Sequence, residues 1–259
     1  MIAVVAFISI ILAVVGALSA QLSPPDSSPT FAVATIKPSP PGAQLSILTR
    51  GRRFSTTAAS LSDLIAFAYG IHPKQITGGP DWVESDKFDV LAESDSESPP
   101  NPKLLKPMVQ KLLADRLRLS FHRGTKELAV YEILPGKNGP KVTKSSSDNN
   151  SAPGVGFKGL GAMTVKNATI ADFAGFLQRY VMDRPVVDRS GISGRYDFTL
   201  DWTPDEFQLS SRAGQSPTLA ADAPDLYTAI QQQLGLKLQS AKLPIEVLVV
   251  DRVAKPSEN

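Results

Sequence analysis

The chain contains no cysteine among its 259 residues. This absence excludes disulfide bonds, thiolate metal sites and cysteine nucleophiles. Histidine is almost as scarce, since His72 and His122 are the only two. They lie far apart, lack the H-E-x-x-H spacing of zinc enzymes and are expected on the surface, so neither a metal site nor a cofactor is predicted. The net charge is only +2 and there is no long basic run, so binding of a nucleic acid is not predicted.

Two familiar catalytic signatures are also missing. No serine lies in a G-x-S-x-G elbow, so no nucleophilic serine stands out. The glycine-rich stretch from Gly154 to Ala162 lacks the Lys-Ser/Thr ending of a phosphate-binding loop, and no strand is expected before it. No residue is therefore predicted to be catalytic.

The first 17 residues, by contrast, form an uninterrupted apolar run. Small residues follow it, with Ala17 and Ser19 suited to the positions before a cleavage site. We therefore predict a signal peptide or membrane anchor over residues 1–20 and a polar, proline-rich tether over 21–30, with a mature chain that begins at Ala20 or Gln21. The run is almost long enough to span a bilayer, so cleavage and retention as a transmembrane anchor both remain open. In either case the rest of the chain is expected outside the cytoplasm, in the periplasm or secreted.

The remaining sequence repeats its pattern. A capping box, in which a polar side chain caps the first turn of a helix, is indicated at Ser60 with Asp63 and again at Thr169 with Asp172, 109 positions later. Apolar residues at helical spacing follow both, and Gly70 is placed to end the first helix. Each helix is followed by a strand centred on an aromatic residue and an aspartate, Phe88–Asp89 and Tyr196–Asp197.

Both halves then show a second helical pattern and a closing apolar pattern. The stretches Leu117–Leu134 and Leu234–Val253 each indicate a strand, a turn and another strand, at an offset of 117 positions. At the other end of the first half, Phe31–Lys37 and Gln44–Arg50 are expected to pair as strands. The sequence thus predicts an α+β fold made of two tandem copies of a strand–helix–strand–helix–strand–strand unit that pack together on a shared core.

The domain boundaries follow from this pattern. The first unit is expected over residues 31–134 and the second over 163–259. The segment between them, 135–162, is polar and poor in apolar residues, which indicates a flexible linker. A polar insert is expected at about Thr203–Pro224.

Several segments, in order, resemble an uncharacterised family of exported soil-bacterial proteins that is enriched in acidobacteria. They are "FAVATIKPS", "LIAFAYGI", "ITGGPDWVESDKFDVLAE", "LLADRLRLSFHRGTKELAVYEI", "RPVVDRSGISGRYDFTLDW" and the C-terminal stretch from "LYTAIQQQLG" onward. The resemblance covers nearly everything after the apolar run. It implies an exported protein of unknown function, whose relatives also form the extracytoplasmic end of BlaR-type membrane peptidase-like proteins. No catalytic residue carries over from this resemblance.

A possible interaction surface is indicated by polar and aromatic residues near strands. The segment from Asp183 to Arg195 is dense in charge, and tryptophan follows aspartate in both halves; the candidates are Asp183, Arg184, Asp188, Arg189, Arg195, Trp82 and Trp202. For the charged residues the alternative is an ion-pair network around a turn, and for the tryptophans it is a cover over the core.

These observations favour a non-enzymatic binding or interaction module of the cell envelope, with an envelope protein, peptide or glycan as its partner. The alternative is an envelope hydrolase that acts on peptide or glycan, for which carboxylates near strands such as Asp81, Asp89, Asp188, Asp197 and Asp201 would supply acid–base groups.

Overall fold

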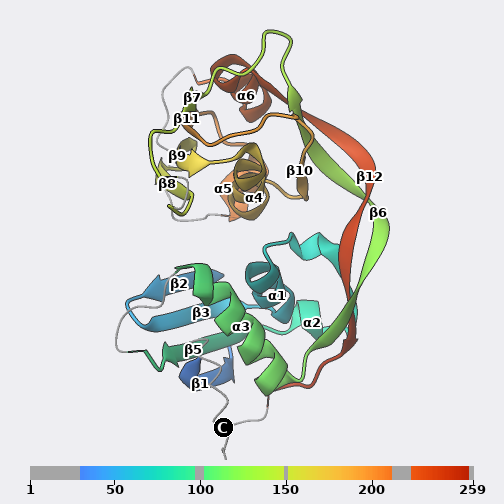
Figure 1. Ribbon diagram of the computed structural model, residues 1–259. Helices are drawn as coiled ribbons and strands as arrows, with labels where there is room; N and C mark the ends of the chain where they lie inside the picture. The colour runs from blue at the N-terminus through green and yellow to red at the C-terminus, as the bar shows by residue number, and fades with distance from the viewer. Residues whose placement is uncertain (1–29, 97–101, 149–150, 212–222, 257–259) are drawn as a thin grey trace, which may run out of the picture.

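The computed structural model describes residues 30–96, 102–148, 151–211 and 223–256. Within them the fold is mixed α+β, as the sequence predicts. The chain forms two lobes that are joined along one side by a long two-stranded ribbon (Figure 1). The predicted signal or anchor, and the tether except for Thr30, lie outside the described residues.

The first lobe is a four-stranded antiparallel sheet, ordered β1-β5-β3-β2, with helices against one face (Figure 1). Its elements are β1 (Phe31–Pro38), β2 (Ser46–Arg50), β3 (Arg53–Ala59), α1 (Leu61–Tyr69), the 3-10 turn η1 (Pro73–Gln75), α2 (Trp82–Ser85), β5 (Phe88–Ser94) and α3 (Pro102–Leu117). The predicted pairing of Phe31–Lys37 with Gln44–Arg50 is wrong. Both strands flank the central pair β5 and β3, which leaves them at opposite edges of the sheet.

The second lobe repeats this strand order, as β7-β11-β9-β8, and again pairs its strands antiparallel. Its elements are β7 (Thr143–Lys144), β8 (Gly154–Gly159), β9 (Ala162–Ala168), α4 (Ile170–Tyr180), β11 (Tyr196–Asp201), α5 (Glu206–Ser211) and α6 (Leu226–Leu234). Strands β7 and β8 lie inside the segment 135–162, so the described part of the expected flexible linker contributes two strands to the sheet.

The ribbon corrects the prediction of two closing hairpins. Each of those stretches is one long strand, β6 (Ser120–Pro135) and β12 (Leu236–Arg252), and the two pair with each other antiparallel over their whole length. Short strands flank the ribbon at its two ends: β4 (Ile76–Gly78) pairs parallel with β12, and β10 (Val186–Asp188) pairs parallel with β6.

The ribbon also explains the apolar pattern that indicated hairpins. The ends of the two strands enter different lobes, so Leu248 and Val250 join the core of the first lobe while Leu236 and Leu238 join that of the second. The stretch between them crosses the space between the lobes and is partly open to water, so polar residues interrupt the apolar ones, and this interruption looks like a turn in the sequence. Buried apolar residues therefore form two clusters, one for each lobe, and the expected shared core is wrong.

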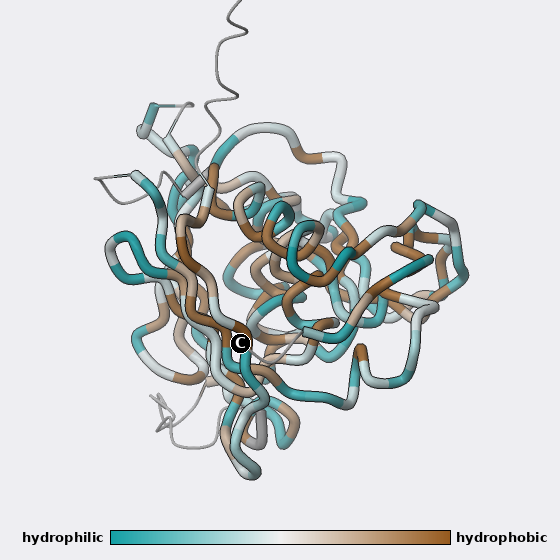
Figure 2. Tube along the Cα trace, turned by 90° about the horizontal axis from the view of Figure 1, so that it is seen from below, coloured by the Kyte–Doolittle hydropathy of each residue, from teal (hydrophilic) through white to brown (hydrophobic). Residues whose placement is uncertain are grey.

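Local sequence signals place the helices as expected. Ser60 with Asp63 and Thr169 with Asp172 both form complete capping boxes, in which each side chain bonds the backbone N–H of the other residue. Gly70 ends α1 in the left-handed conformation, with φ of 69°. Figure 2 views the molecule from the side of the first lobe. The apolar stretches of the chain lie mostly where strands and helices face one another.

Candidate functional site

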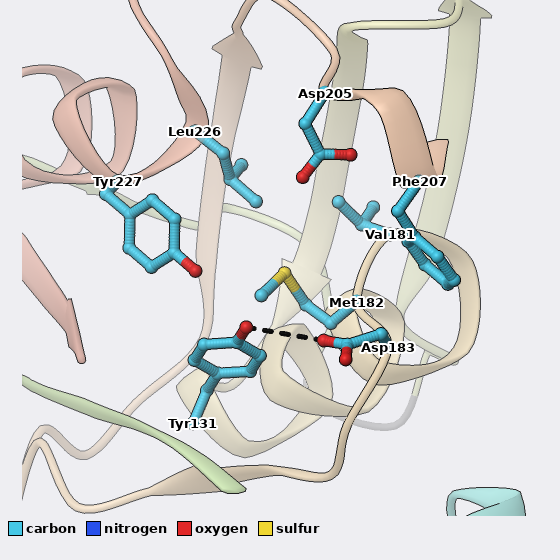
Figure 3. A pocket seen from close by; sticks show the side chains of 8 residues that line it. All are labelled: Tyr131, Val181, Met182, Asp183, Asp205, Phe207, Leu226 and Tyr227. Carbon is cyan, nitrogen blue, oxygen red and sulfur yellow. Dashed lines mark hydrogen bonds between the residues drawn. The ribbon is translucent and has the colours of Figure 1, made fainter. Parts of the chain in front are cut away.

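A pocket of about 240 Å³ opens on the second lobe, beside the ribbon (Figure 3). Its walls come from four places: β6, the loop between α4 and β10, the start of α5 and the start of α6. The lining residues are Tyr131, Val181, Met182, Asp183, Asp205, Phe207, Leu226 and Tyr227. Ligand pockets for whole small molecules are usually larger, so this one matches a single side chain or ring.

Apolar side chains form the base of the pocket. Val181, Met182 and Leu226 are buried and belong to the apolar core of the second lobe. Two rings at the rim are exposed, with 47% of Phe207 and 42% of Tyr227 open to solvent. Both rings therefore present part of their surface to solvent at the rim of the pocket.

Tyr131 and Asp183 form the polar side of the pocket. The Tyr131 hydroxyl donates a hydrogen bond to Oδ1 of Asp183 at 3.3 Å. Tyr131 reaches this position because β10 pairs with β6 at Val186, which brings the preceding loop against the tyrosine. The rings of Tyr131 and Tyr227 meet edge to face, with their centroids 6.1 Å apart. The pocket thus combines aromatic faces with a fixed carboxylate.

The charges around Asp183 keep it ionised. Burial alone would raise the pKa of this carboxyl, but Arg184 donates to it from Nε at 3.1 Å, Lys74 approaches it to 3.6 Å and Tyr131 donates to it, so the pKa lies below its usual value. Burial and the neighbouring Tyr227 raise the pKa of the Tyr131 hydroxyl well above its usual value. At neutral pH Tyr131 is therefore a neutral donor beside a charged acceptor.

Asp205 faces the pocket from the other side (Figure 3). Its Oδ1 accepts a hydrogen bond from the backbone N–H of Gln208 at 2.8 Å, which caps the first turn of α5. Gln208 in turn accepts a hydrogen bond from the indole of Trp202 at 2.8 Å. The buried tryptophan therefore braces the helix that presents Asp205 and Phe207.

The candidate surface residues from the sequence do not form one surface. Asp183 and Arg184 lie at the pocket. Asp188 accepts hydrogen bonds from Ser190 in a tight turn, and the backbone N–H of Arg189 bonds to β6. Arg195 donates to the backbone oxygen of Asn167 at 2.7 Å and lies 3.7 Å from the Asp172 carboxylate.

The two tryptophans are also separated. Trp202 is 1% exposed in the second lobe, whereas Trp82 is half-buried in the first, edge to face with Phe88. Both positions fit a cover over the core. Sequence reasoning missed Tyr131, Asp205, Phe207 and Tyr227, which no local motif marks, because only the path of the ribbon brings the first of them to the other three.

The strand aspartates have structural partners. Asp89 accepts a hydrogen bond from the backbone N–H of Ala58 at 3.0 Å, and Asp197 accepts one from that of Asn167 at 2.8 Å. Ala58 and Asn167 both have φ of 50°, at irregularities in their strands. The two aspartates lie in different sheets and cannot act as an acid–base pair.

The expectation that His72 lies on the surface is wrong, because this residue is buried where the lobes meet. Its Nδ1 accepts a hydrogen bond from the backbone N–H of Lys74 at 3.1 Å, and the ring also bonds to the backbone of Met182 in the other lobe. Beside it, Gln178 donates to the backbone oxygen of Gly70 at 3.3 Å. Burial lowers the pKa of His72 to about 4.

A family model for a protein of unknown function, DUF3738, matches residues 62–253. The chain belongs to the DUF3738 family. This membership agrees with the resemblance to an uncharacterised family. The matched range runs from α1 to the end of β12, so the second lobe, the ribbon and every residue of the pocket lie within it, whereas β1, β2 and β3 of the first lobe precede it.

Other comparisons add little to the family assignment. Neither the curated proteins nor the solved structures give a match. Among the described residues, no helix is long and apolar enough to cross a membrane. The same part of the chain shows no group of three or more metal-ligating side chains.

Proposed function

We propose that this protein is a non-enzymatic binding module that works outside the cytoplasm, and that its pocket receives a cationic side chain of a peptide or protein ligand. The observation that carries this proposal is the convergence of three aromatic rings and two carboxylates on one small pocket, from four separate elements. Aromatic faces attract cations, at about 0.5–2 kcal/mol for each contact. A nearby carboxylate adds a charge-assisted hydrogen bond.

The protein already holds one cation in this manner. The guanidinium carbon of Arg184 lies 5.4 Å from the centre of the Tyr131 ring while its Nε binds Asp183. On the open side of the pocket, Asp205 lies with the partly exposed rings of Phe207 and Tyr227, which again combines a carboxylate with aromatic rings. A lysine or arginine side chain that enters there would lie between rings, with its charge toward Asp205.

We further infer that the two lobes are copies of one ancestral unit. Both sheets have the same strand order, both first helices begin with a capping box, and both sheets contain an aspartate that bonds an N–H at φ of 50°. The ribbon supports the same inference. Tyr131 on β6 pairs with Ser240 on β12. Leu248, 117 positions after Tyr131, pairs with Arg123, 117 positions before Ser240, so the pairing repeats at the same offset.

The pocket lies where the copies differ. At the ribbon offset of 117 positions, Tyr131 and Tyr227 correspond to Leu248 and Gln110. Asp205 and Phe207 belong to the insert, which the first half lacks. Residues that depart from a shared scaffold are the best candidates for function, because the scaffold does not need them.

The proposed location rests on the apolar run of residues 1–17, either as a cleaved signal or as an anchor. The proposed association with BlaR-type proteins rests on the family resemblance alone. The alternative function, an envelope hydrolase, gains no support from the strand aspartates: Asp89 and Asp197 bond to backbone groups in separate lobes.

The test is a calorimetric titration of the protein with capped tripeptides Gly-Lys-Gly and Gly-Arg-Gly, and with the uncharged analogue that carries norleucine. We expect saturable binding of the cationic peptides and at least about tenfold weaker binding of the norleucine peptide, a difference of about 1.4 kcal/mol. Asp205→Asn removes the charge but keeps a side chain that caps α5, so it should weaken binding of the cationic peptides alone.

The matched control is Leu104→Ala on α3 of the first lobe, a side chain exposed to 38%, close to the value for Tyr227. It should leave binding unchanged, whereas Tyr227→Ala should weaken it. Equal binding of all three peptides, no binding at millimolar concentration, or full binding by the Asp205→Asn chain would refute the proposed pocket.

A further inference from the structure

The outer face of the first sheet, which turns away from α1 and α3, carries exposed apolar side chains. Strand pairing places Leu48, Ser55 and Leu91 side by side in one row across β2, β3 and β5. Both leucines are nearly half exposed, and Val33 on β1 is 63% exposed. Exposed leucines and valines gathered on one sheet face mark a contact surface.

The adjacent row on the same face carries an excess of positive charge. Arg50 lies directly opposite Arg53, which lies opposite Glu93. Arg53 and Arg52 share that one carboxylate, at 3.7 Å and 3.8 Å. In the described part of the chain Arg50 has no ion-pair partner, and Nε of Arg52 is buried without a hydrogen-bond acceptor.

This arrangement costs stability. Like charges placed directly opposite each other on neighbouring strands destabilise a sheet. The single carboxylate at this place cannot offset three guanidinium groups. Such a local conflict is expected where a sequence serves binding rather than folding.

The edge beside these residues is open. Strand β2 is the last of its sheet, and no strand among the described residues pairs with its outer side. A hollow of about 480 Å³ lies on the outer face of the sheet next to this edge, lined by Leu48, Arg50, Arg52, Arg53, Ser55 and Glu93. An extended peptide could therefore use the free backbone groups of β2 while its side chains reach the hollow.

The second lobe lacks this surface. The row that corresponds to Leu48, Ser55 and Leu91 is Gly156, Thr164 and Thr199, across β8, β9 and β11. The scaffold therefore folds without exposed leucines at these positions. The apolar row belongs to the first lobe only.

We propose that the outer face and free edge of β2 bind an extended, acidic segment of a partner protein by strand addition. Its acidic side chains meet Arg50 and Arg53, and its apolar side chains contact Leu48 and Leu91. A bilayer fits less well, because the surface is hollowed rather than protruding. An acidic polysaccharide would leave the leucines and the backbone edge unused.

The probe is a capped seven-residue peptide of alternating glutamate and valine with a fluorescent label, and the matched peptide has lysine in place of glutamate. Binding to the full chain is followed by fluorescence anisotropy at two salt concentrations. We expect saturable binding of the acidic peptide only, weakened by salt because the contacts are ionic. The Arg50→Gln/Arg53→Gln chain should bind at least about tenfold more weakly.

Two controls separate this surface from the rest of the molecule. Lys237→Gln/Lys242→Gln removes the same charge from the exposed ribbon, and Asp205→Asn alters the pocket of the second lobe. Both chains should bind the acidic peptide as the unchanged protein does. Failure of the pocket proposal would therefore leave this one standing, and the reverse holds as well.

Hydrogen exchange tests strand addition itself. Bound peptide should slow the exchange of amides in Ser46–Arg50 and leave β8, the edge strand of the other sheet, unchanged. Equal binding of both peptides, binding unaffected by the arginine changes, or the absence of saturable binding at millimolar concentration overturns the proposal. Binding without protection of β2 overturns strand addition.

Discussion

The Asp89 carboxylate accepts a hydrogen bond from the backbone N–H of Ala58, on the neighbouring strand, at 3.0 Å. Ala58 is buried and has φ of 50°, a conformation that few residues other than glycine adopt. The strand irregularity there leaves this N–H without a partner in the sheet, and Asp89, together with Ser39, supplies one. The carboxylate thus stabilises an irregular backbone.

Replacement of this carboxylate should lower stability. Asp89→Ala removes one of two acceptors from a buried N–H, and we expect a loss of about 1–2 kcal/mol in the free energy of unfolding, measured by urea titration. Asp115→Ala is the control, because that residue forms only an exposed pair with Lys111 on α3; its cost should stay below about 0.5 kcal/mol. Equal effects of the two changes would show that Asp89 does not support the backbone.

The buried His72 should make stability depend on pH. Its pKa is lowered to about 4 from 6.5, so between these values the unfolded chain binds more protons than the folded one. Stability is then complete above about pH 6.5 and falls by about 2–3 kcal/mol as pH drops toward 4. The groups that act on the ring are Lys74, Asp183 and the Met182 backbone; the Gln75 side chain accepts a hydrogen bond from the backbone N–H of His72 instead.

Urea titrations of three chains between pH 4 and 7.5 check this. His72→Gln should flatten the slope relative to the unchanged protein. His122→Gln, which retains His72, should keep it. A slope that survives in His72→Gln would place its origin in the carboxylates instead.

The ribbon should contribute to both lobes at once. Ile133 on β6 is fully buried in the second lobe, so Ile133→Ala should cost about 2–5 kcal/mol. Removal of the chain from Leu236 onward takes buried residues from both cores, at roughly 1.5–3 kcal/mol for each, and should abolish folding of both lobes. A truncated chain whose first lobe still unfolds cooperatively would contradict the shared role of β12.

A cut in the loop between β7 and β8 should have a much smaller effect. The cut leaves the ribbon and both cores intact, and changes in loop closure cost well under about 1 kcal/mol. Proteolysis between Ser145 and Pro153 followed by thermal unfolding should show one transition near that of the intact chain. Two fragments that separate before unfolding would contradict this expectation.

Local structure was largely predictable from the sequence. The two capping boxes, the end of α1 at Gly70 and the aromatic–aspartate strands depend on neighbouring residues, and all occur as expected. Long-range pairing was not predictable. A strand with two apolar ends and a polar middle has the pattern of a hairpin, because a solvated crossing and a turn both favour polar residues.

The candidate site shows the same limit. Asp183 and Arg184 stood out by their charge, and the structure places both at the pocket. Tyr131, however, lies in the first half of the sequence, and only the pairing of β10 with β6 brings Tyr131 next to Asp183 and Arg184. The burial of His72 was equally unpredictable from the sequence. Its position after a helix indicates a surface loop, but the second lobe covers it.

The central claim is that the pocket binds a cationic side chain through residues that only the second lobe has. The most direct test is amide hydrogen exchange of the full chain with and without saturating capped Gly-Arg-Gly. Exchange should slow in Val181–Arg184 and in Leu226–Tyr227, and should not change in Val109–Gln110, the segment of the first lobe that corresponds to Leu226–Tyr227. Unchanged exchange around the pocket, or equal protection of both lobes, would contradict the claim.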